Sequence, residues 1–495
     1  MKWILFGEIA YILVIIFVIF RVLYDTRSST KALAYILLIL FVPFLGIIFY
    51  FSVGINYRKR KLYSKKIVED GQIRARIINK MNTYSEAISN SGLIAQKSET
   101  LIEFIRRAGS SPLTANNEVK LLIDGDEKFP ELLNELENAT AHIHIEYYIY
   151  ENDITGNQVS DILIKKANQG VEVRFLYDDF GSHGLSNTFI KNLQEAGVQT
   201  APFYKIHWYA FAHRLNYRNH RKIVIIDGKV SFVGGINMSD KYRNDLKADN
   251  HLFWRDTHLM IKGQATAYLQ YLFMCDWNFC SETPLQYSES YFLDNTEQEI
   301  IKKEVVQIVA SGPDSKLPVI FYSLLEAISS AKKSIYITSP YFIPDKSLMD
   351  ALIIAIQGGL DVKIIIPGVS DSKMVNAAAS AYYTELLQVG AKIYKYNKGF
   401  VHAKTMVIDD DLAIVGSANM DYRSFDLNFE VNAMVYSTNI AKQLTEAFIN
   451  DLKVSEQIEA NTWLNRPKYI HLWEKIVRLI SPFSQAYQCT RHLRI

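Results

Sequence analysis

Cysteine is scarce in this chain of 495 residues, which holds only Cys275, Cys280 and Cys489. Three cysteines cannot build a disulfide framework, and the first two lack the second pair of ligands that a structural zinc site needs. We therefore expect reduced thiols facing a cytosol-like compartment. Disorder is not expected, because 49% of the residues are apolar and 13% are aromatic, which is enough for a large core.

The chain also has little net charge, a formal +2, and its positive charge is concentrated at the two ends. Residues 1–61 hold eight Lys or Arg against Glu8 and Asp25, and residues 466–495 hold six against Glu474. The 404 residues between these ends carry, by difference, a net charge of about −9. A nucleic-acid enzyme would place positive charge on its catalytic body, because phosphate contacts supply most of its affinity. We therefore expect no nucleic-acid partner.

Two long apolar runs near the N-terminus predict a pair of membrane-spanning helices. Residues 3–20 are apolar apart from Glu8, and residues 32–53 contain no charge at all. At 1.5 Å per residue, the second run is long enough for a hydrocarbon core of about 30 Å. The basic cluster at residues 58–61 favours a hairpin over residues 1–57 with both chain ends in the cytoplasm. A cleaved signal peptide and a buried core helix are the alternatives.

After a predicted basic juxtamembrane linker, residues 58–114, the same order of strand-like and helix-like patterns occurs twice. In the first half, residues 115–310, the predicted elements are 143–149, 159–167, 171–177, 185–195 and 198–204. In the second half, residues 311–455, they are 334–342, 347–357, 362–366, 375–389 and 391–396. Both halves are therefore predicted to be βαβαβ units of an α/β fold. Residues 456–495 have the pattern of a basic amphipathic helix, which would contact either the membrane or the domain surface.

One motif occurs twice at a spacing of 182 residues: His220-Arg-Lys222 with Asp227, Gly234, Gly235 and Asn237, then His402-Ala-Lys404 with Asp409, Gly416, Ser417 and Asn419. Residues two apart on a strand face the same side, so each His shares a surface with its Lys. If a two-residue turn follows Asp227, paired positions sum to 457 and place Asn237 beside His220. The corresponding sum of 821 places Asn419 beside His402. Asp227 and Asp409 then lie near the turns, where capping is more plausible than substrate contact.

This set of residues suits the chemistry of a phosphodiester. Two Lys ammonium groups and two Asn amides can hold its non-bridging oxygens and stabilise the charge that develops in the transition state. One imidazole attacks phosphorus to form a phosphohistidine, and the other protonates the leaving alcohol. No metal or other cofactor is required, because the Lys and Asn side chains compensate the charge. Two complete copies imply two halves folded around one reaction centre.

The duplicated motif resembles the signature of the phospholipase D superfamily over roughly residues 115–450. Together with the apolar N-terminus and the stretches Ile145-Glu-Tyr-Tyr148, Tyr177-Asp-Asp179 and Asn219-His-Arg-Lys222, the whole chain is similar to bacterial cardiolipin synthases. The resemblance implies two homologous phospholipase D-like halves that form a pseudo-two-fold sandwich. It also implies a multi-pass protein of the bacterial inner membrane with a cytoplasmic catalytic body. Its partners would be phosphatidylglycerol and other anionic membrane lipids, and the oligomeric state stays open.

The activity implied is transfer of a phosphatidyl group from one phosphatidylglycerol to another, which gives cardiolipin and glycerol. The resemblance makes His220 and His402 the nucleophile and the general acid/base, with His220 favoured as nucleophile. It assigns phosphate binding to Lys222, Lys404, Asn237 and Asn419, and orientation of the histidines to Asp256 and Glu430. The first copy departs from the superfamily at Gly235, where a serine such as Ser417 is more usual, so a hydroxyl contact to phosphate is expected only from Ser417.

Hydrolysis of the phosphohistidine by water would make the protein a phospholipase D, and the residues alone do not separate this reaction from transfer. A membrane-tethered nuclease of the same superfamily and an inactive membrane scaffold are the weaker alternatives. The charge of the middle segment opposes the first, and the two intact motif copies oppose the second.

Overall fold

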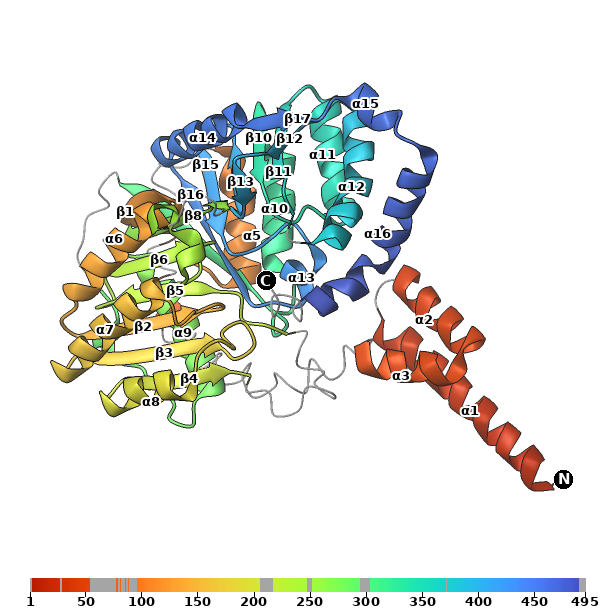
Figure 1. Cartoon of the computed structure of the whole chain (residues 1–495), viewed down its shortest axis with the longest axis horizontal. Coiled ribbons are helices and arrows are strands. Elements are labelled where there is room, and N and C mark those ends of the chain that lie inside the picture. The colour runs from red at the N-terminus through yellow and green to blue at the C-terminus, as the bar shows by residue number, and fades with distance from the viewer. Residues whose placement is uncertain are drawn as a thin grey trace. The chain divides into compact units, whose positions relative to one another are not determined.

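The computed structural model describes residues 2–26, 29–53, 96–204, 217–246, 252–293, 303–370 and 372–488, with a few positions between 77 and 88. The chain forms two compact units, one made mainly of residues 1–69 and the other of residues 70–207 and 214–495 (Figure 1). Most of the predicted linker at residues 58–114 lies outside the described residues. Its last part does not, and the helix α5 (Glu99–Gly109) packs into the core of the larger unit.

The smaller unit contains the helices α1 (Lys2–Asp25), α2 (Ser29–Phe41) and α3 (Pro43–Val53). Within the described residues, α1 is the one helix that is long and apolar enough to cross a membrane. The second apolar run is interrupted at Val42, because Pro43 cannot donate a backbone hydrogen bond and its ring opposes a continuing helix. The predicted pair of membrane-spanning helices is therefore not confirmed.

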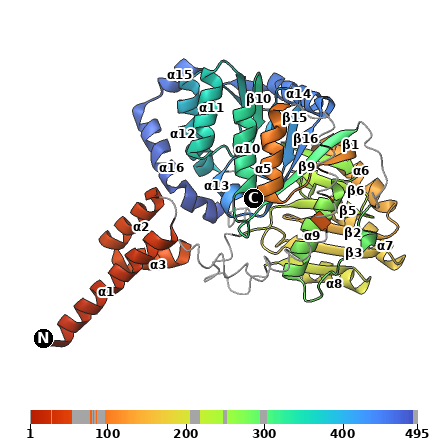
Figure 2. The same cartoon turned by 180° about the vertical axis from the view of Figure 1, so that it is seen from behind.

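Fifteen strands in the described part of the larger unit form one sheet, and its two halves have the same order of strands outward from the centre (Figures 1 and 2). From the centre outward, the first half contains β1 (Thr114–Ile123), β8 (Thr257–Lys262), β6 (Val230–Gly234), β5 (Lys222–Ile226), β2 (His142–Tyr147), β3 (Glu172–Asp178) and β4 (Gln199–Phe203). The second half contains, in the same order, β9 (Glu304–Ser311), β16 (Glu430–Tyr436), β15 (Leu412–Gly416), β14 (Thr405–Ile408), β10 (Ser334–Thr338), β11 (Asp361–Pro367) and β12 (Lys392–Tyr396), followed by β17 (Ser455–Gln457).

The chain thus has an α/β fold of two homologous halves that meet where β1 pairs with β9. The first half also contains the helices α6 (Asp124–Glu137), α7 (Ile154–Asn168), α8 (Asn187–Glu195) and α9 (Thr266–Cys280), and the short strand β7 (Phe253–Arg255). The second half adds α10 (Val319–Ser330), α11 (Lys346–Gln357), α12 (Lys373–Gln388), β13 (Gly399–Val401), α13 (Tyr422–Asp426), α14 (Thr438–Lys453), α15 (Ala460–Leu464) and α16 (Lys468–Gln488). Because β9 takes the place of β1 in the second half, the division predicted at residue 310 falls within this strand.

Each predicted strand and helix of the two βαβαβ units is present: β2, α7, β3, α8 and β4 in the first half, and β10, α11, β11, α12 and β12 in the second. Successive side chains of β2 point to opposite faces of the sheet, and both faces are buried. Ile143 and Ile145 belong to the core formed with α6, α7 and α8, whereas His144 faces α9 through a hydrogen bond to Gln270. The sheet is therefore covered by helices on both faces.

The two motif hairpins have the same register, and it differs from the predicted one by a single residue. Ile226 pairs with Val230 and Ile408 pairs with Leu412, so paired positions sum to 456 and 820. The predicted register was wrong because each turn has three residues rather than two. Asp227 and Asp409 leave their strands with φ values of 53° and 54°, and their carboxylates face the start of a neighbouring strand.

Candidate active site

The two motif histidines each bind a carboxylate from the opposite half of the chain. Glu430 Oε2 lies 3.0 Å from His220 Nδ1, and Asp256 Oδ2 lies 2.7 Å from His402 Nδ1. Asp256 and Glu430, which the resemblance implied as partners of the histidines, thus lie within hydrogen-bond distance of them. That each partner comes from the other half was not predicted.

Backbone hydrogen bonds fix this exchange between the halves. The amide of His220 donates to the carbonyl of Phe429 at 2.9 Å, and Glu430 is the next residue. In the second copy the amide of His402 donates to the carbonyl of Arg255 at 2.7 Å, and Asp256 is the next residue. β7 and β13 also pair in parallel just before these positions. The backbone of each histidine is therefore hydrogen-bonded to the residue of the opposite half that directly precedes its carboxylate partner.

Burial and the carboxylates together set the protonation state of the two imidazoles. Burial lowers the pKa of His220 to about 4, with Lys222 contributing and Glu430 opposing. It also lowers the pKa of His402 to about 3, with Lys404 contributing and Asp256 opposing. Both rings are therefore neutral near pH 7. A neutral ring whose Nδ1–H donates to a carboxylate keeps the lone pair of Nε2 free for attack on phosphorus.

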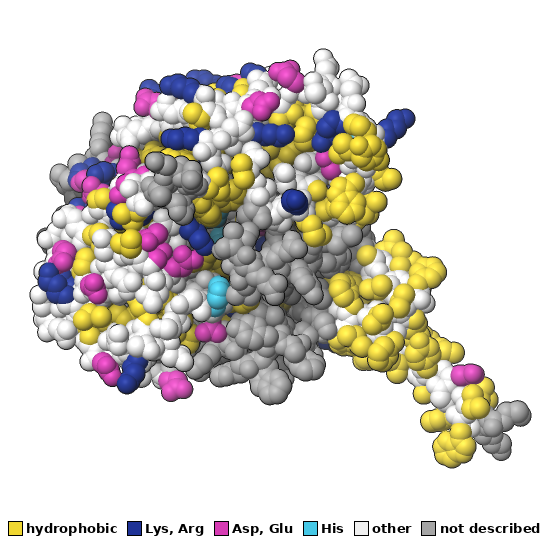
Figure 3. Space-filling view, viewed as in Figure 1, with side chains coloured by type: hydrophobic (Ala, Val, Ile, Leu, Met, Phe, Trp, Pro, Cys, Tyr) yellow, Lys and Arg dark blue, Asp and Glu magenta, His cyan; other side chains and the backbone are white. Residues whose placement is uncertain are grey.

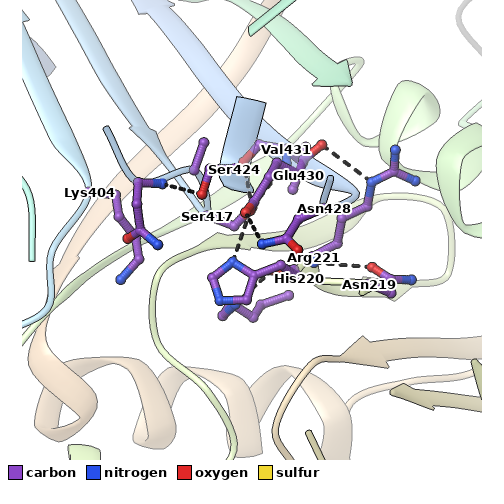
Figure 4. A network of polar contacts seen from close by, with 12 residues as sticks. Asn219, His220, Arg221, Lys404, Ser417, Ser424, Asn428, Glu430 and Val431 are labelled. Carbon is purple, nitrogen blue, oxygen red and sulfur yellow. Dashed lines mark hydrogen bonds and ion pairs between the residues drawn. The ribbon is translucent and has the colours of Figure 1, made fainter. Parts of the chain in front are cut away.

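Glu430 is the centre of a hydrogen-bond network (Figure 4). Besides the contact with His220, it accepts hydrogen bonds from Ser417 Oγ at 2.5 Å and from Asn428 Nδ2 at 3.2 Å. Burial raises the pKa of Glu430, but His220, Lys222 and Ser417 outweigh it and leave the pKa below its usual value. The structure therefore places Ser417, predicted to bind substrate, behind the histidine as a donor to its carboxylate.

The same geometry explains why the first motif copy has glycine where the second has serine. A Cβ atom at Gly235 would lie 2.1 Å from Asp256 Oδ1, which no side chain tolerates. The side chain of Asp256 is one methylene group shorter than that of a glutamate. Its carboxylate lies against the backbone of Gly235, whereas the carboxylate of Glu430 accepts a hydrogen bond from the hydroxyl of Ser417. The departure at Gly235 therefore follows from the choice of carboxylate in the first half.

The two lysines of the motif are buried beside the histidines. Lys222 Nζ donates to the carbonyl of His220 at 2.6 Å, and Lys404 Nζ lies 2.9 Å from His402 Nδ1. Burial lowers the pKa of Lys222 to about 7; Lys404 adds to this effect, while Glu430 and Asp256 oppose it. Lys222 thus interacts with charged groups on both halves, which places the two half-sites around one centre.

The two asparagines have different surroundings. Asn237 Nδ2 donates to Tyr242 Oη at 2.7 Å, and this hydroxyl lies 3.4 Å from His402 Nδ1. Asn237 is thus linked through Tyr242 to His402, and its predicted position beside His220 stays a prediction. Asn419 Oδ1 is buried and has no hydrogen-bond partner among the described residues. An amide oxygen only accepts hydrogen bonds, so a phosphate oxygen would have to approach Asn419 through Nδ2.

The structure does not bring Asp227 and Asp409 to the histidines. The carboxylate of Asp227 accepts hydrogen bonds from the backbone amides of residues 140–142. That of Asp409 accepts them from the amides of residues 332–334 and forms an ion pair with Lys97. Both carboxylates are therefore occupied at the turn end of their hairpins.

Several aromatic residues that sequence reasoning missed surround the imidazoles. The ring of Tyr148 lies 4.7 Å from that of His220, while Trp254 and Phe400 lie 5.6 and 5.8 Å from that of His402. Tyr148 is the next-to-last residue of the predicted strand at residues 143–149, so its position near a strand end was the available signal. No group of three or more His, Cys, Asp or Glu side chains suited to a metal ion occurs in the described part of the chain.

Comparison with known proteins places this geometry in a family. A family model described as cardiolipin synthase, phospholipase D-like domain, matches residues 132–277 and 324–452, and a second, described as phospholipase D-nuclease N-terminal, matches residues 9–54. The chain belongs to the phospholipase D-like cardiolipin synthase family. The first of these matches contains both motif copies, and the second contains most of α1 with α2 and α3.

Relatives named cardiolipin synthase match almost the whole chain. One from Alkalihalophilus pseudofirmus is 40% identical over 480 residues, which cover 96% of this chain and 93% of the relative. One from a Geobacillus species is 41% identical and covers 94% and 92%, and one from Staphylococcus aureus is 40% identical and covers 96% and 95%. The crystal structure of a phosphatidylserine synthase from Haemophilus influenzae has the same fold, with a TM-score of 0.58, 13% identity and coverage of 79% of this chain and 99% of that one.

Proposed function

We propose that this protein is a cardiolipin synthase that transfers a phosphatidyl group from one phosphatidylglycerol to another and releases glycerol. The observation that carries the proposal is the exchange of carboxylates between the halves, which sets two neutral histidines beside two buried lysines. Family membership and relatives of that name over almost the full length support the substrate. Hydrolytic phospholipase D activity is the closest alternative, because it shares the first step.

In the first step, the phosphodiester of phosphatidylglycerol binds with its non-bridging oxygens near Lys222, Lys404 and Asn419. His220 Nε2 attacks phosphorus in line with the glycerol oxygen, and the P–O bond to glycerol breaks as the P–N bond forms. The negative charge of the bound phosphodiester raises the pKa of His402, which takes up a proton and gives it to the leaving oxygen. Glu430 stabilises the positive charge that develops on His220.

In the second step, a second phosphatidylglycerol replaces the released glycerol. His402 accepts the proton of its terminal hydroxyl, and that oxygen attacks the phosphohistidine. The P–N bond breaks, His220 returns to its neutral form, and cardiolipin leaves. Water in place of the second lipid would give phosphatidic acid. Asp227 and Asp409 take no part in either step, because their carboxylates hold backbone amides.

We propose further that the larger unit works on the cytoplasmic face of the membrane and that α16 contacts the lipid. A row of exposed apolar side chains at helical spacing supports this contact: Tyr469, Leu472, Trp473, Ile476 and Leu479. Hydrophobic side chains and basic residues lie together over this helix in Figure 3. The opposite side of α16 is buried at Glu474 and Val477, so the row faces outward. Basic residues on the same segment would favour anionic lipid.

Purified full-length protein in detergent micelles containing phosphatidylglycerol tests the reaction. We expect cardiolipin and glycerol in equal amounts by lipid chromatography and glycerol assay. His220→Ala and His402→Ala should each lower the rate by about a thousandfold or more, because the two groups act as one unit. His183→Ala, at an exposed histidine, is the matched control. Phosphatidic acid in place of cardiolipin would make the protein a hydrolase, and substantial turnover in either active-site variant would overturn the shared site.

A further inference from the structure

The second apolar run of the N-terminal unit folds back on itself as a helical hairpin. The ring of Tyr35, in the middle of α2, lies 5.5 Å from the ring of Tyr50 in the second half of α3. Closer to the bend, a Cβ atom at Gly46 would lie 2.7 Å from the carbonyl oxygen of Leu38. Glycine is required at this position because the two backbones touch there. α2 and α3 are therefore antiparallel, with Val42 at the tip.

This hairpin is too short to cross a bilayer. At 1.5 Å per residue, α2 with its 13 residues is about 20 Å long and α3 with its 11 residues is about 17 Å, against about 30 Å for the hydrocarbon core. The 24 residues of α1 extend about 36 Å, which is sufficient to span it. The hairpin packs on residues 15–22 of α1, while Trp3 and Phe6 in the first turns stay 88% and 69% exposed. The hairpin therefore covers only the C-terminal part of α1.

The tip and the open end of the hairpin differ in polarity. At the tip, Phe41 and Phe44 are 81% and 74% exposed, and hydrophobic side chains cover this unit in Figure 3. At the open end, Tyr50 Oη donates to Asp25 Oδ2 at 3.5 Å, and Asp25 forms an ion pair of 2.8 Å with Arg21. A hairpin with an apolar tip and a polar base is suited to insertion into one leaflet from one side.

The basic residues of the sequence support the same arrangement. Arg21 and Arg27 precede the hairpin, Lys31 lies in the first turn of α2, and residues 58–61 are all Lys or Arg. With an inserted hairpin, all these charges lie on one side of the membrane, and Lys2 is the basic residue on the other. Two full spans would divide the charges between the two sides. The positive-inside rule therefore favours a cytoplasmic base.

We propose that the chain crosses the membrane once, through α1, and that α2 and α3 form a re-entrant hairpin in the cytoplasmic leaflet. The N-terminus then lies outside the cell and everything after α1 lies on the inner side, in contrast to a hairpin of two spans. This goes beyond the proposed function and rests only on its membrane location. The lipids of one leaflet are the partner of the exposed tip.

Cysteine labelling of the full chain in protoplasts tests this topology. In a background with Cys275→Ala, Cys280→Ser and Cys489→Ser, the probes are Lys2→Cys and Ser29→Cys, treated with a membrane-impermeant maleimide. We expect Lys2→Cys to react in intact protoplasts and Ser29→Cys, at the exposed start of α2, to react only after the membrane is permeabilised. Two full spans predict the opposite pattern.

Reaction of Ser29→Cys in intact protoplasts, or protection of Lys2→Cys until permeabilisation, would overturn the proposal. Synthesis of cardiolipin by both variants serves as the control for correct folding. If neither variant makes cardiolipin but the background protein does, the labelling is repeated at Trp3 and Asp25 with the same expected pattern. The labelling reports position and not turnover, so a protein that proved to be a hydrolase would leave this inference intact.

Discussion

The two carboxylates that hold the histidines have different supports. Glu430 accepts hydrogen bonds from Ser417 and Asn428, whereas Asp256 lies against the backbone of Gly235 and accepts the amide of Thr257 at 2.7 Å. The two motif copies therefore differ in the groups that contact the carboxylates of Glu430 and Asp256. The two histidines can therefore have different roles although their motif residues match.

Glu430→Gln tests the orienting role of the carboxylate. An amide cannot compensate the charge that develops on His220, so we expect kcat to fall by about a hundredfold or more with little change in KM. Ser417→Ala, which removes one donor to the same carboxylate, should cost less than the glutamine substitution. Steady-state kinetics on phosphatidylglycerol micelles measure both. An unchanged kcat in Glu430→Gln would show that His220 needs no charged partner.

The low pKa of Lys222, about 7 against its ordinary 10.5, predicts how activity depends on pH. As pH rises through 7, Nζ of the free enzyme loses its proton and the site loses a positive charge that the phosphodiester needs. We therefore expect kcat/KM to fall on the alkaline side. In Lys222→Arg the guanidinium stays charged, so whatever activity remains should persist at least about one pH unit higher. Identical alkaline limits in the two proteins would assign the titration to another group.

At the scale of elements, the hairpin turns depend on Asp227 and Asp409. Burial raises the pKa of Asp409, but Lys97 and the amides of residues 332–334 outweigh it and leave the pKa below its usual value. Its charged form therefore contributes stability that is present above the ordinary carboxyl pKa and is lost as pH falls through the lower native value.

Asp409→Asn should lower the free energy of unfolding by about 1–3 kcal/mol while kcat at 25 °C stays within about twofold. Thermal unfolding at pH 7 and a rate assay well below the transition separate the two effects. Asp350→Asn, at an exposed ion pair on α11, is the control and should change stability by less than about 0.5 kcal/mol. A large loss of kcat without loss of stability would instead place Asp409 in the reaction.

The element α16 gives a prediction about lipid contact. Leu472→Glu with Leu479→Glu should reduce cardiolipin formation on phosphatidylglycerol vesicles by about tenfold or more, because two exposed apolar side chains no longer enter the bilayer. Activity on short-chain substrate in detergent should change little. Ile354→Glu, at a side chain of α11 that is 71% exposed, is the matched control. Equal losses on vesicles and in detergent would indicate a structural role for the row.

Local patterns predicted the ten strands and helices of the two βαβαβ units, because alternation and helical spacing are properties of adjacent residues. The hairpin register was missed because Asp227 leaves its strand to bind amides some 85 residues away. The pairing of His220 with Glu430 spans 210 residues and was suggested only by resemblance. The bend at Val42 was missed because the length of the apolar run outweighed Pro43 and Gly46, which instead mark a turn and a close backbone contact.

At the scale of the whole molecule, the halves have separate hydrophobic cores but share the centre of the sheet and both histidine contacts. Neither half can form the site alone. We therefore expect the larger unit of the detergent-solubilised protein to unfold in one calorimetric transition. Asp256→Asn should shift that whole transition to lower temperature, although the substituted residue lies in the first half. Two separate transitions would show that the halves fold independently.

The exchange of carboxylates between the halves has a consequence for how such a site can diverge. In a symmetric dimer of a single half, every substitution would appear on both sides of the reaction centre. Joining two copies in one chain removes that restriction, so one copy can keep Gly235 against an aspartate while the other places Ser417 on a glutamate. Two copies in one chain can thus give two chemically identical imidazoles different roles, one as the proposed nucleophile and the other as the proposed general acid and base.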